Sequence, residues 1–170
     1  MKLKEITIAL AIIASSATVA HANTVTFTGS IIDSPCSINP DDVDQTVDLG
    51  QVAARELATG GTSTPRNFTI RLENCDLTSL TNGTVTTTFT GSESTAVPDT
   101  LGISGDASNA GVVITNGDGA AVTLGQASTP QILQAGDNTL LYSAYLKGAA
   151  AAAAVPGKFT AIADYTLAYQ

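Results

Sequence analysis

Two cysteines, Cys36 and Cys75, are the residues of this 170-residue chain with the clearest potential for chemistry. In an exported protein, which the N-terminal residues described below indicate, an even pair of cysteines is typical of a disulfide. Their separation of 39 positions would make that bond worth about 4 kcal/mol in the chain-entropy model. Two thiols without histidine cannot complete a tetrahedral zinc site, and no C-x-x-C motif supports a redox role. The pair therefore predicts a structural disulfide.

Other residues with catalytic or ligand potential are sparse. The one histidine, His21, lies in a segment expected to be removed, so the mature chain could form no Ser-His-Asp triad. The acidic residues of segment 41–48, "DDVDQTVD", could offer oxygen ligands to calcium, but they lack the spacing and the glycine of an EF-hand loop. A solvated acidic turn is the favoured interpretation, and ion binding there stays open. We predict no catalytic residues, no metal and no cofactor.

The first 22 residues predict a secretory signal peptide. Lys2 and Lys4 form a short basic region, an apolar stretch follows from Ile6 to Ile13, and Ala20-His21-Ala22 fits the small-x-small cleavage rule. The stretch is too short to span a membrane. We therefore expect residues 1–22 to be removed and the mature chain to begin at Asn23.

Charge and length restrict the mature product further. Cleavage would change the formal net charge from -8 to -9, leaving 5 basic and 14 acidic residues. Such an acidic chain is a poor partner for nucleic acid or an anionic membrane surface. The remaining length suits one domain with one core.

Strand signals dominate the mature chain, with glycine and proline at short intervals. One short helix is expected within residues 51–61, ended by Gly60 and Gly61. This pattern predicts an all-β fold, an antiparallel β-sandwich of around seven or eight strands. The expected strands cover residues 24–31, 47–50, 67–75, 82–91, 111–124, 138–148 and 159–169.

Several local features are also predicted. Cys75 falls on the opposite parity to Phe68, Ile70 and Leu72, which indicates a bulge or strand end near Asn74. Hairpin-type turns are expected at 82–83 and, more strongly, at 116–119. The alanine run 149–154 is too short for an isolated helix, so a loop or a strand crossing of small residues is expected.

Two alternating segments stand at opposite ends of the mature chain. In the first, Val25, Phe27 and Ile31 share one face with Gly29, while Thr24, Thr26, Thr28 and Ser30 occupy the other. In the second, the odd positions place one row on one face: Phe159, Ala161, Ala163, Tyr165, Leu167 and Tyr169.

These segments carry a resemblance to a known family. "TVTFTGSIIDSPCSI" (24–38) is similar to the start of a chaperone–usher pilus subunit, where a donor segment with a central glycine precedes the first cysteine. "DQTVDLGQV" (44–52) and "LENCDLT" (72–78) resemble segments of that family, as do the penultimate Tyr169 and Gly157 at the fourteenth position from the end. The resemblance covers nearly all of the mature chain and is closest to P-pilus and type 1 structural subunits.

The resemblance implies a fold and an activity. The fold would be an incomplete immunoglobulin-like β-sandwich, residues 34–170, that lacks its last strand and leaves a hydrophobic groove. Residues 23–33 would be a donor-strand extension, with Val25, Phe27, Gly29 and Ile31 entering the groove of a neighbouring subunit. The groove strand, which would also meet the chaperone, would present Gly157, Phe159, Ala161, Ala163, Tyr165, Leu167, Tyr169 and the carboxylate of Gln170.

The resemblance also implies the partners. They would be a periplasmic pilus chaperone, an outer-membrane usher and neighbouring pilins, with no nucleic acid and no small-molecule substrate. The product would be a structural subunit of an adhesive fimbria on a Gram-negative cell, polymerised by donor-strand exchange and contributing to cell adhesion.

Alternatives remain open at this stage. Both end segments could pair within one complete sandwich. The extension before Cys36 is shorter than in many rod subunits and closer to tip or adaptor subunits, whereas the middle of the chain resembles a rod subunit, so a minor adaptor, tip or terminator role stays possible. A secreted carbohydrate-binding adhesin is disfavoured, because the chain has no room for a lectin domain and no Trp. A secreted enzyme is disfavoured by the missing histidine.

Overall fold

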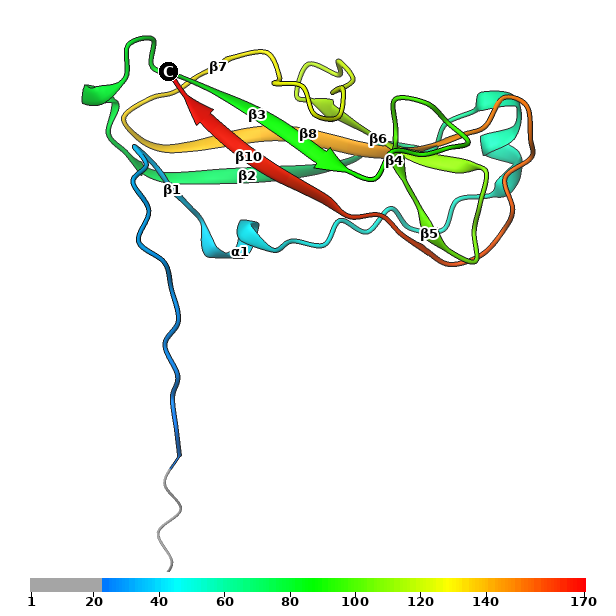
Figure 1. Ribbon diagram of the computed structural model, residues 1–170, viewed down its shortest axis with the longest axis horizontal. Coiled ribbons are helices and arrows are strands. Elements are labelled where there is room, and N and C mark those ends of the chain that lie inside the picture. Colours follow the sequence, from blue (N-terminus) through cyan, green and yellow to red (C-terminus); the bar gives the residue numbers. More distant parts are fainter. Residues whose placement is uncertain (1–22) are drawn as a thin grey trace, which may run out of the picture. The chain divides into compact units, whose positions relative to one another are not determined.

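The structure is a computed structural model that describes residues 23–170 (Figure 1). The signal-peptide prediction for residues 1–22 lies outside the described residues. The chain divides into two units, Met1–Ile32 and Asp33–Gln170.

The described part of the first unit, residues 23–32, has no regular secondary structure. Its large apolar side chains are open to solvent: Val25 is 73% exposed, Phe27 89% and Ile31 104%. A β-strand needs partners for its backbone groups, and the alternating sequence alone supplies none. The expected strand over 24–31 is therefore not formed in the isolated chain.

Two antiparallel sheets and a small third one build the second unit (Figure 1). The largest has the order β1-β2-β8-β6-β4, comprising β1 (Ser37–Ile38), β2 (Arg66–Cys75), β8 (Gly136–Gly148), β6 (Ala110–Asn116) and β4 (Leu101–Gly102). The second has the order β10-β3-β7, comprising β10 (Ala163–Tyr169), β3 (Thr84–Gly91) and β7 (Gln131–Ile132). The third pairs β5 (Ser104–Gly105) with β9 (Phe159–Thr160).

The two main sheets pack face to face around one apolar core. Ile70 and Leu72 of β2 and Val85 of β3 are completely buried within it. The ring of Tyr142, on β8, lies 5.2 Å from the ring of Phe89, on β3, and its hydroxyl donates a 2.7 Å hydrogen bond to Thr87. Because this bond joins strands of different sheets, it fixes the facing layers as well as filling space. The predicted sandwich is confirmed.

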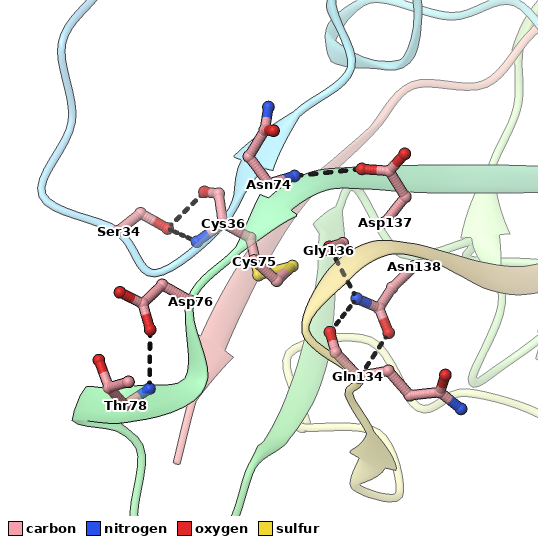
Figure 2. The surroundings of a disulfide bond; sticks show 10 residues. All are labelled: Ser34, Cys36, Asn74, Cys75, Asp76, Thr78, Gln134, Gly136, Asp137 and Asn138. Atoms are coloured by element: carbon pink, nitrogen blue, oxygen red, sulfur yellow. Dashed lines mark hydrogen bonds between the residues drawn. A yellow bond between two sulfur atoms is a disulfide. The ribbon is translucent and has the colours of Figure 1, made fainter.

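The predicted disulfide is present and closes one end of the core (Figure 2). Cys36 and Cys75 are buried, with their Cα atoms 4.2 Å apart. The pairing of β2 with β8 shifts register between Leu72 and Cys75, and Asn74 adopts a φ of 53°. This irregularity confirms the bulge that parity predicted, and it turns Cys75 inward to meet Cys36.

Four further sequence predictions differ from the structure. Residues 47–50 form no strand, because no neighbouring strand pairs with them. Asn82-Gly83 is not a hairpin turn: it connects β2 and β3, which belong to different sheets. The turn at 116–119 does reverse the chain, but its returning arm pairs only at Ala121, as a single bridge to Thr115. Residues 23–170 form ten strands rather than seven or eight, since several of the strands are only two residues long.

Helical structure is short, as expected. It comprises α1 (Pro40–Val43) and the 3-10 segments η1 (Ala54–Gly60) and η2 (Leu77–Ser79). The expected helix within 51–61 is thus confirmed as a 3-10 segment, and the alanine run 149–154 is confirmed as a loop. None of the helices among residues 23–170 has the length and apolar character needed to cross a bilayer.

Candidate functional site

The last strand, β10, is paired along one edge only. All seven of its residues pair with β3, and the backbone of Gln170 continues the ladder to Thr84. β10 is the outermost strand of its sheet. Its odd positions are half-buried and its even positions exposed, so the predicted alternation is confirmed. An edge of this kind presents unpaired N–H and C=O groups that can accept another strand.

The segment 43–52 is far from β10 in the sequence, and it lines the same groove as the start of that strand. Among the described residues, no backbone hydrogen bond joins 44–52 to either main sheet. It is held by other contacts. The Gln45 side-chain amide donates to the Thr69 carbonyl at 3.1 Å, and Leu49 and Val52 pack against the second apolar cluster. Its backbone is therefore available for pairing.

An open groove of about 1280 Å³ runs between these two walls. One wall is the segment 43–52, and the other is formed by residues 154–165. The side chains that line it from the sandwich interior are apolar and come from both main sheets: Phe68, Phe89, Leu101, Val112, Ile114, Ala144 and Leu146. A groove with an apolar floor, bordered by the free edge of β10 and by the segment 43–52, can bind an extended chain segment by strand addition.

The structure brings only some of the predicted groove residues together. Five line the groove: Gly157, Phe159, Ala161, Ala163 and Tyr165. Leu167 and Tyr169 do not line it and pack instead against the main core. Gln170 lies farther along, where its backbone pairs with Thr84. The groove therefore ends near Tyr165 rather than continuing along the whole of β10.

A hydrogen-bonded link stands where the groove ends. The Tyr165 hydroxyl donates to the Asp42 carbonyl at 2.9 Å. The buried Asp42 carboxylate in turn accepts from the backbone N–H of Arg71 at 2.7 Å and from its Nε and Nη2 at 2.9 Å each. Sequence reasoning missed this link, because Tyr165 and Asp42 are 123 positions apart and no local pattern relates them.

Electrostatics keep the members of this link in fixed protonation states. Hydrogen bonds from Arg71 hold the pKa of the Asp42 carboxyl below its usual value, despite the opposing effect of burial. Asp42 likewise raises the pKa of Arg71. Burial raises the pKa of the Tyr165 phenol, and the charge of Asp42 adds to the shift. Tyr165 is therefore a neutral donor, and Asp42 an ionised acceptor, near neutral pH.

Gly157 contributes to the groove through close packing. A Cβ at this position would lie 2.6 Å from the backbone nitrogen of Ala107 and 2.8 Å from the Cβ of Asp106. Only glycine fits such an approach without displacing the neighbouring loop. The resemblance singled out this residue, and the structure gives it a steric reason.

No cluster of three or more metal-ligating side chains occurs among residues 23–170. Within the acidic segment, the Asp42 carboxylate is already engaged by Arg71. The Asp48 carboxylate accepts from the backbone N–H of Gly50 at 2.8 Å, which is a local turn contact. These contacts account for two of the carboxylates that the sequence offered as ligands.

Together, the fold and the groove define a class of protein: an incomplete immunoglobulin-like sandwich whose last strand borders an open apolar groove. Comparison with known proteins identifies the family. Residues 25–170 match the family model described as "Fimbrial protein". The chain belongs to this fimbrial family and is a structural pilus subunit.

Individual relatives agree with this assignment. The chain is 50% identical to the Fimbria A protein of Serratia marcescens over 100% of both chains. It is 53% identical to the Major MR/P fimbria protein of Proteus mirabilis, with 95% of this chain and 93% of the relative covered. The crystal structure of the P pilus rod subunit PapA superposes with a TM-score of 0.72 at 34% identity, covering 81% of this chain and 100% of that one.

A subunit within a solved chaperone–usher pilus, studied for rod uncoiling, is also similar. It has a TM-score of 0.79 at 34% identity and covers 92% of this chain and 100% of its own. This match covers a larger share of the present chain, 92%, than the match to PapA, which covers 81%.

Proposed function

We propose that this chain is a major fimbrial subunit that polymerises by strand donation, with residues 23–33 of one copy filling the groove of the next. Val25, Phe27 and Ile31 are the side chains that enter the groove, and Gly29 provides the close approach between them. Residues 34–170 form the domain that accepts the strand. The subunit carries no catalytic activity in this proposal, since its role is to build the fibre.

One observation carries this proposal: the chain has both an apolar segment with exposed side chains and an apolar groove bordered by a free strand edge. Phe27 and Ile31 are almost fully exposed, so burial in a groove would gain roughly 1.5–3 kcal/mol for each. The edge of β10 and the segment 43–52 can both supply main-chain hydrogen bonds to the incoming strand.

The size of the groove is compatible with that occupant. Val25 and Ile31 are six positions apart, which spans roughly 20 Å in an extended strand. The groove-lining part of the C-terminal region runs from 157 to 165, eight positions, or roughly 26 Å if extended. The donor row therefore fits in the open part of the groove and need not reach Leu167 or Tyr169.

A chaperone and an usher complete the proposed pathway. An open apolar groove with an unpaired edge is an aggregation hazard, so a periplasmic pilus chaperone would occupy it first and an outer-membrane usher would direct the replacement. Contacts along β10 and at the terminal carboxylate of Gln170 are the proposed chaperone contacts. The signal-peptide pattern of residues 1–22 supports export into the periplasm of a Gram-negative cell and display on its surface.

The position within the fimbria is proposed from the relatives. The Proteus relative is a major fimbria protein, and the solved P pilus relative is a rod subunit. Their similarity covers most of this chain, which favours a major rod subunit over a tip, adaptor or terminator role despite the short extension.

The test uses matched substitutions on the two faces of the donor segment. The mature chain, residues 23–170, is prepared with Phe27→Asp on the apolar face or with Thr28→Asp on the opposite face. We expect the unaltered chain and Thr28→Asp to form fibres visible by electron microscopy, and Phe27→Asp to remain unpolymerised. Both substitutions add the same charge one position apart, so a general charge effect would act equally on both.

A peptide complements this experiment. A synthetic peptide with the sequence of residues 23–33 should raise the melting temperature of the Phe27→Asp chain, because it fills the groove that the altered segment cannot fill. The same peptide with Phe27→Asp should have no effect. Fibres from the Phe27→Asp chain, or equal stabilisation by both peptides, would refute strand donation through this face.

A further inference from the structure

No backbone ladder joins the two walls of the groove, so their separation needs another physical cause. One wall continues into β10, in the three-stranded sheet. The other, 43–52, follows α1 and has no backbone ladder to either main sheet. Without the missing strand, nothing in the ladders themselves fixes the distance between the walls at this end of the groove.

A continuous chain of hydrogen bonds supplies that connection. It begins at the Tyr165 hydroxyl on β10, passes to the Asp42 carbonyl in α1, and continues from the Asp42 carboxylate to the backbone and guanidinium of Arg71 on β2. Because β10 and β2 lie in opposite sheets, this series of hydrogen bonds connects the two layers of the sandwich beside the groove. Its separations all lie between 2.7 and 2.9 Å.

The Asp42 carbonyl, which accepts the hydrogen bond from Tyr165, is held in place by contacts that do not involve Tyr165. The Asn39 N–H donates to the Arg71 carbonyl at 3.0 Å, and the Asn39 side chain accepts from the N–H of Asp41 at 3.0 Å. Together with the three hydrogen bonds from Arg71 to Asp42, these contacts fasten α1 to β2. The Asp42 carbonyl is therefore a fixed point to which β10 is tied.

We propose that Tyr165 is a positioning residue that holds the groove at the width required by an incoming strand. The inference rests on the proposed function and adds to it a reason why the empty groove is ready to accept a strand. Tyr165 is suited to this role, because its ring packs near Phe89 with centroids 6.3 Å apart while its hydroxyl reaches α1. The preceding inward residue, Ala163, is too short to reach.

The role predicts a specific kinetic signature. In the empty groove, the Tyr165 bond limits the movement of the wall that begins at Val43. Once a strand is inserted, its own backbone hydrogen bonds to both walls hold their separation. Loss of the hydroxyl should therefore slow the association of a strand and leave its dissociation unchanged. A loss of fold stability alone would lower the melting temperature without this selective change.

The experiment measures peptide uptake by the mature chain, residues 23–170, in the Phe27→Asp background that keeps its own segment from polymerising. Tyr165→Phe removes the hydroxyl and retains the ring. The matched control is Tyr145→Phe, since Tyr145 lies on β8 and does not line the groove. The probe is a fluorescently labelled peptide of residues 23–33, followed by anisotropy during association and after dilution.

We expect Tyr165→Phe to slow association about fivefold, the size typical of one neutral hydrogen bond, with the dissociation rate nearly unchanged and the melting temperature of the empty chain lowered by no more than about 3–4 °C. Tyr145→Phe should match the parent in every respect. Unchanged or faster association in Tyr165→Phe would overturn the positioning role while leaving strand donation intact. If the peptide binds none of the three chains, both the proposed function and this inference fail.

Discussion

Removal of the disulfide should destabilise the domain strongly without closing the groove. The perturbation is the double substitution Cys36→Ala and Cys75→Ala, made in the Phe27→Asp chain so that polymerisation does not obscure unfolding. Both cysteines are buried, and neither lines the groove. Alanine fits their space and leaves no polar group unpaired, so the main effect is loss of the cross-link itself.

The magnitude follows from the loop that the disulfide closes. A separation of 39 residues corresponds to about 4 kcal/mol in the chain-entropy model. For a domain of this size, each kcal/mol shifts the melting temperature by about 3–4 °C. The double variant should therefore unfold about 12–16 °C below its disulfide-bonded parent, and reduction of the parent should give a similar value.

The assay is thermal and urea unfolding followed by circular dichroism, with and without saturating peptide of residues 23–33. Stabilisation by the peptide should remain, because the disulfide lies at the end of the core away from the groove lining. A loss of less than about 1 kcal/mol would refute the loop-entropy reasoning. Loss of the peptide effect would show that Cys36 positions the groove wall, contrary to the expectation.

Three further predictions concern packing, a buried hydroxyl and pH. Gly157→Ala should weaken peptide binding in the same anisotropy assay, since its Cβ would lie 2.6 Å from the Ala107 nitrogen. Tyr142→Phe should lower the free energy of unfolding in urea by about 1–2 kcal/mol, because the buried hydroxyl of Thr87 loses its donor. The folded pKa of Asp42 is depressed, so its contribution to stability is present above the unfolded value near 4 and lost as the pH falls below it. Asp42→Asn should flatten the dependence of unfolding free energy on pH below about 4, measured by urea titrations at several pH values.

The sequence could predict the features that depend on the alternation of side chains between the two faces of a strand. The alternation of β10 follows from successive side chains pointing to opposite faces, and the parity conflict at Cys75 located the bulge at Asn74. The disulfide needed only the count of cysteines and the expected compartment. Each of these predictions depends on neighbours in sequence or on composition.

Features that depend on a partner strand were predicted less well. Residues 47–50 have strand composition but no ladder in the isolated chain, and in the proposed function the strand beside them comes from another copy. The same reason applies to 24–31. The end of the groove at Tyr165 could not be predicted either, since it arises from contact with Asp42 across 123 positions.

The disulfide also determines the path of mechanical load. In a fibre built by strand donation, tension on residues 23–32 enters the domain through Ser34 and reaches Cys36 two positions later. There the covalent bond to Cys75 transfers it directly to the end of β2, a strand that pairs with β8 from Arg66 onward. Tension that enters from the N-terminal side therefore does not extend the backbone of residues 37–74, which includes α1 and the segment 43–52. That segment is loaded only by the strand held in the groove, across hydrogen bonds and packed side chains rather than along its own backbone.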